Sequence, residues 1–157
     1  MGEFAEMNNT DPAVARIFEA YKSAVHAKDV DAFMRLYDPG VRVFDAWGIW
    51  SYEGTSAWRG AIEGWFMSHP SERVKVSFDD VSAVVTPALA LVSATVTYAG
   101  VSAQGEKVRA MQNRLTWALK TSGHVLRIIH EHTSAPAGFD DGKVILQRPS
   151  KAEAGAT

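Results

Sequence analysis

Residues 41–54 read Val-Arg-Val-Phe-Asp-Ala-Trp-Gly-Ile-Trp-Ser-Tyr-Glu-Gly, a strand pattern that runs into a turn. Within it, Asp45 has four large apolar neighbours, Phe44, Trp47, Ile49 and Trp50. Apolar surroundings raise the pKa of a carboxyl group because desolvation disfavours its charged form. A carboxylate of raised pKa is a candidate general base. The alternative is that Asp45 only starts a surface turn, since most Asp side chains are exposed.

Two helices are predicted before this stretch. Asp11-Pro12 combines an N-cap residue with a proline at the first helical position. Apolar residues then recur at helical spacing as far as about Lys28: Val14, Ile17, Phe18, Tyr21 and Val25. Asp29 caps a second, shorter helix, whose inner side carries Val30, Phe33, Met34 and Tyr37. Asp38-Pro39-Gly40 is predicted to stop that helix.

A third helix and then strands are predicted after it. Thr55 or Ser56 is the expected N-cap, His69-Pro70 the expected end, and the inner face carries Trp58, Ile62, Trp65 and Phe66. The period then changes to two, which predicts a strand in residues 74–78 that residues 81–85 extend or follow. Further strands are predicted in residues 90–98, 108–119 and 125–134, with a short edge strand in residues 143–147. This order predicts an α+β fold in which a curved antiparallel sheet wraps around three N-terminal helices. The cavity of such a cone is the default ligand site.

Composition limits the classes of partner. The chain has 157 residues, a net charge of −2 and no cysteine, which excludes disulfides and thiolate metal sites. It lacks the clustered basic face of a nucleic-acid partner and the roughly 18-residue apolar run of a membrane helix. Residues 1–6 lack the apolar core of a secretory leader, and Met7 is an alternative native start. We expect a cytoplasmic protein with one domain in residues 11–148, a flexible N-terminus (1–10) and a disordered tail (149–157).

Three segments resemble the SnoaL-like and ketosteroid-isomerase-like proteins of the NTF2-like superfamily. They are residues 19–33, residues 44–57, and Leu126-Arg127-Ile128-Ile129-His130-Glu131-His132-Thr133-Ser134-Ala135-Pro136. The third is similar to the family's closing strand, W-x-I-x-H-x-H-x-S-x-P, with Leu126 in place of the tryptophan. Asp38-Pro39-Gly40 and the same closing segment also resemble the association domain of calcium/calmodulin-dependent kinase II, an oligomerising member of the fold. The resemblance covers about residues 11–136 and implies an NTF2-like cone that forms a homodimer through the outer face of its sheet.

The resemblance also implies roles for two residues. Tyr21 falls where ketosteroid isomerases place the tyrosine that hydrogen-bonds the substrate's oxyanion, and Asp45 falls where they place the proton-shuttling base. Those isomerases use a protonated aspartate on the strand that corresponds to residues 113–116, and no acid occurs there. The resemblance therefore disfavours steroid isomerisation itself and leaves a pair of Tyr21 and Asp45 with a different third partner.

His130 and His132 are two residues apart on a predicted strand and so share a face. They are candidates for metal ligands, for a structural hydrogen-bonded pair, or for a polar wall of the pocket. A metal site needs further ligands, so we expect no metal. Arg114 is expected on the same face. If the apolar face of the neighbouring strand turns inward, Asn113, Trp117 and Glu131 line the pocket, and Arg114 with the two histidines faces a partner subunit. The opposite orientation stays open, and Glu131 is expected on one face with Arg127, Ile129 and Thr133.

The remaining candidates are aromatic. Trp47, Trp58, Trp65 and Trp117 are suited to stack on a flat, apolar ligand, although such residues also build cores and interfaces. Tyr21 is likewise a candidate for a buried core position.

Two functions are therefore kept. The first is an isomerase, cyclase or dehydratase that uses Asp45 as general base on a small apolar carbonyl compound and needs no organic cofactor. The second is a non-catalytic module that binds a small hydrophobic ligand or assembles into oligomers.

Overall fold

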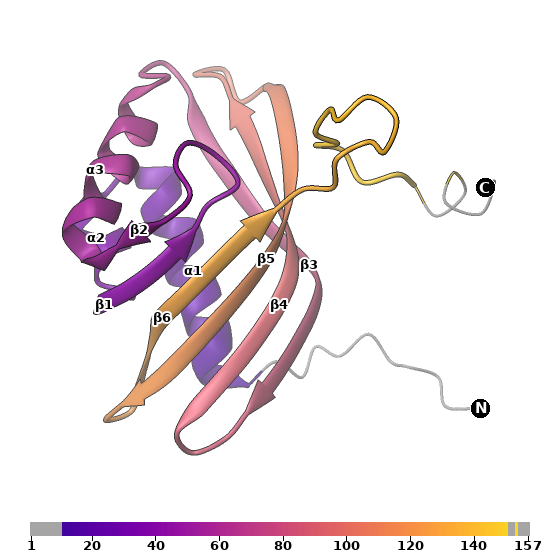
Figure 1. The fold of residues 1–157 in the computed structure, drawn as a ribbon. Helices are drawn as coiled ribbons and strands as arrows, with labels where there is room; N and C mark the ends of the chain where they lie inside the picture. Colours follow the sequence, from indigo (N-terminus) through magenta and orange to yellow (C-terminus); the bar gives the residue numbers. More distant parts are fainter. Residues whose placement is uncertain (1–10, 151–152, 154–157) are drawn as a thin grey trace.

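The computed structural model describes residues 11–150 and residue 153. The predicted flexible N-terminus (1–10) and most of the predicted disordered tail lie outside these residues. The elements are α1 (Pro12–Ala27), α2 (Val30–Met34), β1 (Tyr37–Phe44), β2 (Tyr52–Glu53), α3 (Gly54–Met67), β3 (Arg73–Val85), β4 (Leu89–Val101), β5 (Lys107–Ser122) and β6 (Val125–Ser134). Three helices that pack against a curved sheet confirm the predicted α+β fold (Figure 1). No helix in the described part of the chain is long and apolar enough to cross a membrane.

The sheet has six strands in the order β2-β1-β6-β5-β4-β3. Every neighbouring pair is antiparallel except β1 and β6, which run parallel. The parallel pair brings the end of β1 beside the end of β6, where Phe44 is the register partner of His132. The sheet bends around the helices, with α1 packed against β3 and α3 against β1 (Figure 1). The core lies between the helices and the concave face of the sheet.

Helix α1 forms as its sequence predicts. The Asp11 carboxylate accepts the Ala13 backbone N–H at 2.8 Å, which satisfies a donor that has no partner within the helix. Lys28 ends the helix in the left-handed conformation with φ 55°. The buried stripe contains Val14, Ile17, Phe18, Tyr21, Ala24 and Val25. Tyr21 is thereby held in the core with its ring against Phe33 and Trp117.

The predicted boundaries around α2 and α3 need correction. Helix α2 ends at Met34, and Tyr37 to Gly40 belong to strand β1, not to a helix and its stop. Pro39 is tolerated there because the register between β1 and β6 shifts between Tyr37 and Arg42. Helix α3 begins at Gly54, whose φ of +80° favours glycine, and its N-cap residue, Glu53, makes no side-chain cap bond. Thr55 and Ser56 therefore lie inside the helix.

Strand β6 contains a bulge that changes which residues face the core. Ala118 pairs with His130 and Leu119 with Ile128, so Ile129 is an extra residue without a counterpart on β5. Before the bulge Leu126 and Ile128 are buried, and after it Glu131 and Thr133 are buried. The prediction that Glu131 shares a face with Arg127 and Ile129 is therefore wrong, because it assumed an uninterrupted alternation along the strand.

Residues 143–147 do not form the predicted edge strand. The segment makes one isolated bridge, between Ala137 and Val144. It instead lies along β5, where the Gln112 N–H donates to the Leu146 carbonyl at 2.8 Å. The Arg148 N–H donates to Gln112 Oε1 at 2.6 Å.

Candidate functional site

A cavity of about 650 Å³ lies inside the cone, between α1, α3, the loop after β1 and the concave face of β4, β5 and β6. This volume is within the usual range of small-molecule sites. Its walls are apolar and aromatic for the most part, and a few polar groups converge on it. The polar groups used below are Tyr21, Asp45, Tyr98, Asn113, Glu131 and Thr133.

Asp45 borders the cavity directly after β1. The Thr133 hydroxyl donates to its Oδ1 at 2.8 Å and itself accepts the Ala46 N–H at 2.9 Å. Partial burial raises the pKa of Asp45, and hydrogen bonds from Thr133 and from the backbone amides of Ala46 and Trp47 offset part of that rise. The result is an oriented, partly desolvated carboxylate at the wall of the cavity.

Tyr21 and Tyr98 bring two phenol groups to the same cavity. Their hydroxyl oxygens are 2.8 Å apart, so one hydroxyl donates to the other. The hydroxyl that accepts this bond keeps its own proton for a further acceptor. Burial raises the pKa of both groups, so both stay neutral donors at physiological pH. The pair can therefore donate a hydrogen bond to an oxygen of a ligand.

Glu131 is a buried carboxyl group at the cavity, with only 2% of its surface exposed. The Tyr37 hydroxyl and the Trp117 Nε1–H both donate to Oε1, each at 2.7 Å. Burial raises the pKa of Glu131 to about 7, although these two hydrogen bonds lower it in part, and the negative charge of Asp45 raises it further. Glu131 is the register partner of Trp117 on β5. Ketosteroid isomerases place an acid at the position of residues 113–116, on β5. Here the acid is on the neighbouring strand, β6.

Two buried polar atoms at the cavity have no hydrogen-bond partner among the described residues. They are Asn113 Oδ1 and Trp58 Nε1. Buried polar groups are nearly always paired in native proteins, and leaving one unpaired is costly. Trp58 Nε1 lies near the Tyr37 hydroxyl, whose pKa it lowers in part, so the acceptor left for an occupant of the cavity is Asn113 Oδ1.

The other predicted site residues fall in two places. Trp47 (46% exposed) and Trp65 border the cavity, whereas Trp117 is fully buried behind Glu131 and does not reach it. Arg114, His130 and His132 lie on the outer face of the sheet.

The two histidines contact strand β1 on that outer face. His130 Nδ1 is 2.7 Å from the Arg42 carbonyl oxygen, and both imidazole rings pack edge-on against Phe44. Among residues 11–150 and 153, no group of three His, Cys, Asp or Glu side chains is arranged to hold a metal ion.

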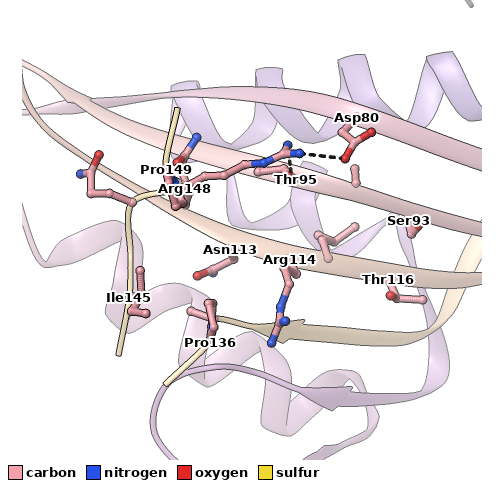
Figure 2. Close-up of a pocket in the computed structure, with 15 residues that line it drawn as sticks. Asp80, Ser93, Thr95, Asn113, Arg114, Thr116, Pro136, Ile145, Arg148 and Pro149 are labelled. Atoms are coloured by element: carbon pink, nitrogen blue, oxygen red, sulfur yellow. Dashed lines mark hydrogen bonds and ion pairs between the residues drawn. The ribbon is translucent and has the colours of Figure 1, made fainter. Parts of the chain in front are cut away.

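A second hollow, of about 370 Å³, lies between the outer face and the segment after β6 (Figure 2). Arg148 crosses it and reaches Asp80 Oδ2 at 3.2 Å and Thr95 Oγ1 at 3.3 Å (Figure 2). The Arg114 Nε–H donates to Ser134 Oγ at 3.1 Å. This hollow has a single carboxylate, which is already paired, so the cone cavity is the better candidate for chemistry.

Sequence reasoning missed Tyr98, Thr133 and the role of Glu131. Nothing local indicates that the Tyr98 hydroxyl meets that of Tyr21, 77 residues away. No local pattern marks Glu131 as buried, because Arg127 and Thr133 occupy alternate positions with it and the bulge at Ile129 changes which residues face the core.

The profile of the SnoaL-like domain matches residues 14–138. The chain belongs to the SnoaL-like domain family. Several solved structures have the same fold as this SnoaL-like domain. An NTF2-like protein of unknown function from Pseudomonas putida superposes with a TM-score of 0.76 at 20% identity, covering 87% of this chain and 94% of that one.

Two further structures carry functional descriptions. A protein from Xanthomonas campestris that is assigned as a calcium/calmodulin-dependent protein kinase II association domain has a TM-score of 0.66 at 18% identity, covering 83% of this chain and 97% of that one. A protein assigned as a scytalone dehydratase from Novosphingobium aromaticivorans has a TM-score of 0.67 at 12% identity, with coverage of 88% and 91%. At these identities the likeness of the SnoaL-like domain to both is one of fold alone. No functionally curated protein shows significant sequence similarity to the chain.

Proposed function

We propose that this SnoaL-like domain is an enzyme that performs acid–base chemistry on a small, apolar carbonyl compound. Asp45 is the general base that removes a proton from the carbon next to the carbonyl. Tyr21, paired with Tyr98, donates a hydrogen bond to the carbonyl oxygen as negative charge develops on it. Isomerisation, aldol-type cyclisation and dehydration all begin with this step.

One observation carries the proposal: a partly desolvated carboxylate and a pair of neutral phenols border the same apolar cavity. A base is useful at neutral pH when its pKa approaches the working pH, and burial moves Asp45 in that direction. Trp58 and Trp65 give the cavity flat apolar walls that suit a ring-containing substrate. The fold shared with a protein assigned as a scytalone dehydratase is consistent with this chemistry but does not specify it.

The proposal is tested by hydrogen exchange, which needs the base but no complete turnover. 2-Tetralone, a flat two-ring ketone, is incubated with the protein in deuterium oxide, and loss of its α-hydrogen signals is followed by NMR. We expect Asp45→Asn to slow the catalysed exchange by on the order of 10²-fold or more, the usual contribution of a general base. Glu53→Gln is the control, because Glu53 is exposed and pairs with Arg42 outside the cavity. Exchange that is the same in Asp45→Asn and in the unchanged protein would contradict the proposal.

A second candidate function is assembly, alone or together with catalysis. It is favoured by apolar side chains exposed on the outer face of the sheet, where Val84 and Leu91 are register partners and Leu89 lies on the same side. We propose a homodimer formed through this face. The fold shared with a kinase association domain is consistent with it.

A further inference from the structure

We infer that Glu131 is the proton donor of the cavity and that the substrate is a β-hydroxy carbonyl compound, which the protein dehydrates. This inference rests on the proposed role of Asp45 as general base and narrows it to one class of substrate.

The placement of the two carboxyl oxygens of Glu131 is the first argument. Both of its protein partners, the Tyr37 hydroxyl and the Trp117 Nε1–H, donate to Oε1. Neither partner borders the cavity, whereas Glu131 does. Oε1 is therefore committed to the protein interior, and Oε2 is the oxygen left for a ligand. Because Oε1 already accepts two hydrogen bonds, a proton on Glu131 belongs on Oε2.

The contrast between Glu131 and Asp45 is the second argument. Two carboxyl groups that sense each other's charge are not both ionised easily, and the more buried one keeps the proton. Glu131 is almost fully buried, and its pKa is raised to about 7. Asp45 is only partly buried and receives hydrogen bonds that favour its ionised form. At neutral pH the pair therefore supplies one base, Asp45, and one acid, Glu131.

The hydrogen bonds from Tyr37 and Trp117 also favour proton transfer from Glu131 to the substrate. Their two hydrogen bonds stabilise the carboxylate that is left after the proton has moved, because hydrogen bonds to an ionised acceptor are stronger than those to a neutral one. Tyr37 and Trp117 are thus positioning residues, and Glu131 is the group that touches the substrate.

A separate acid and base fit elimination better than isomerisation. An isomerisation can use a single base that takes the proton and returns it elsewhere, whereas elimination must also protonate a departing hydroxyl group. Asp45 takes the α-proton, the electron pair of the C–H bond forms the C=C bond, and the C–O bond breaks as the proton on Glu131 Oε2 passes to the leaving oxygen. The products are an α,β-unsaturated carbonyl compound and water. Asp45 then loses its proton to solvent and Glu131 regains one, so no other reactant is needed.

The unpaired amide oxygen of Asn113 supports a substrate with a hydroxyl group. Asn113 Oδ1 is buried at the cavity and accepts no hydrogen bond from the described residues. A hydroxyl group is the part of a β-hydroxy carbonyl compound that can donate to it, while the same hydroxyl oxygen accepts from Glu131. A purely apolar ketone would leave this acceptor unsatisfied.

The test compares dehydration with α-hydrogen exchange. The dehydration probe is 4-hydroxy-4-phenylbutan-2-one, whose product, the conjugated enone, is followed by its ultraviolet absorbance. Exchange of 2-tetralone in deuterium oxide is measured in parallel. We expect Glu131→Gln, which keeps an oxygen acceptor for Tyr37 and Trp117, to slow dehydration by on the order of 10²–10⁴-fold, the usual contribution of a general acid. We expect exchange to slow by less than about 10-fold, since it needs no proton for a leaving group. Glu53→Gln is again the matched control.

The pH dependence of the unchanged protein is the second measurement, and it does not rely on a variant that folds. Dehydration is expected to fall as the pH rises above about 7, the pKa of Glu131, because the donor is then ionised. Exchange should lack this fall.

The outcomes separate the two proposals. A protein that exchanges α-hydrogens but does not dehydrate the probe, or a Glu131→Gln variant that dehydrates as fast as the unchanged protein, overturns the inference and leaves the role of Asp45 standing. A protein that does neither reaction overturns both.

Discussion

Thr133 joins the Asp45 carboxylate to the backbone through a single hydroxyl group, which accepts from Ala46 and donates to Oδ1. Replacing Thr133 by valine removes a hydrogen bond that favours the ionised carboxylate, so we expect the pKa of Asp45 to rise further. Leaving the Ala46 N–H without its partner should also lower the free energy of unfolding by about 1–3 kcal/mol. NMR titration of the carboxyl carbon of Asp45 measures the first effect and urea unfolding the second.

Ser134→Ala is the matched control for that variant. Ser134 is the next residue on β6, but its hydroxyl accepts from Arg114 on the outer face of the sheet. Its removal should leave the titration of Asp45 where it was. If Thr133→Val lowers the pKa of Asp45 or leaves it unchanged, Thr133 does not stabilise the ionised base.

Glu131 makes the stability of the protein depend on pH in a defined direction. Its pKa is about 7 in the folded state against an ordinary value of 4.5, so the folded state holds a proton that the unfolded state has lost. Stability is therefore full below pH 4.5 and falls as the pH rises through 7, by roughly 3 kcal/mol in total at about 1.4 kcal/mol per pKa unit. Glu131→Gln removes this pH dependence. Between pH 5 and 8 the free energy of unfolding of the variant should therefore rise relative to that of the unchanged protein, and urea unfolding at several pH values measures this difference.

Asp45→Asn provides the comparison, because removing the neighbouring negative charge lowers the pKa of Glu131. The loss of stability should then be complete at a lower pH, and be smaller in total, than in the unchanged protein. Parallel curves for Glu131→Gln and the unchanged protein across this range would mean that Glu131 is ionised throughout.

At the scale of the elements, local patterns predicted what depends on local physics. The buried stripe of α1 and the alternation of β4 were readable because each follows one period, 3.6 or two residues. The bulge at Ile129 was not readable, because it is defined only by pairing with β5. One extra residue reverses the direction of every later side chain in the strand. The inward direction of Glu131 therefore depends on a bulge that the sequence of β6 alone does not predict.

Helix α3 forms one wall of the cavity although it contains three glycines. These glycines differ in backbone conformation and in the space around them. A Cβ at Gly60 or Gly64 would meet no atom within 4 Å, whereas Gly54 has a φ of +80°. We expect Gly60→Ala and Gly64→Ala each to raise the free energy of unfolding by about 0.5–1 kcal/mol, because alanine loses less conformational entropy in a helix. Gly54→Ala should lower it by about 1 kcal/mol, since the left-handed conformation strains a residue with a Cβ. Thermal unfolding of the three variants measures these changes, and stabilisation by Gly54→Ala would contradict the helix start assigned here.

At the scale of the whole molecule, the sheet separates two surfaces of different chemistry. Tyr21 and Asp45, the two positions to which the resemblance pointed, both border the cavity. The partnership of Tyr21 with Tyr98 and the burial of Glu131 arise only when α1, β4 and β6 close into a cone. Such contacts join residues far apart in sequence and have no local signature. The candidate chemistry thus depends on closure of the fold more than on any one motif.

The outer face of the sheet carries the last prediction, which concerns assembly. Leu91 is 54% exposed there, with its register partner Val84 also exposed. Stable dimers bury about 1,200–2,000 Å² in total, with an apolar centre that excludes charge. We expect a dimer at micromolar concentration in sedimentation velocity, and we expect Leu91→Arg to convert it to a folded monomer, because an unpaired guanidinium at the centre of the interface would have to be desolvated. Met67→Arg is the control, since Met67 is 76% exposed but lies at the end of α3, away from the sheet. A monomeric unchanged protein, or a Leu91→Arg variant that stays dimeric, would show that this face is not the interface.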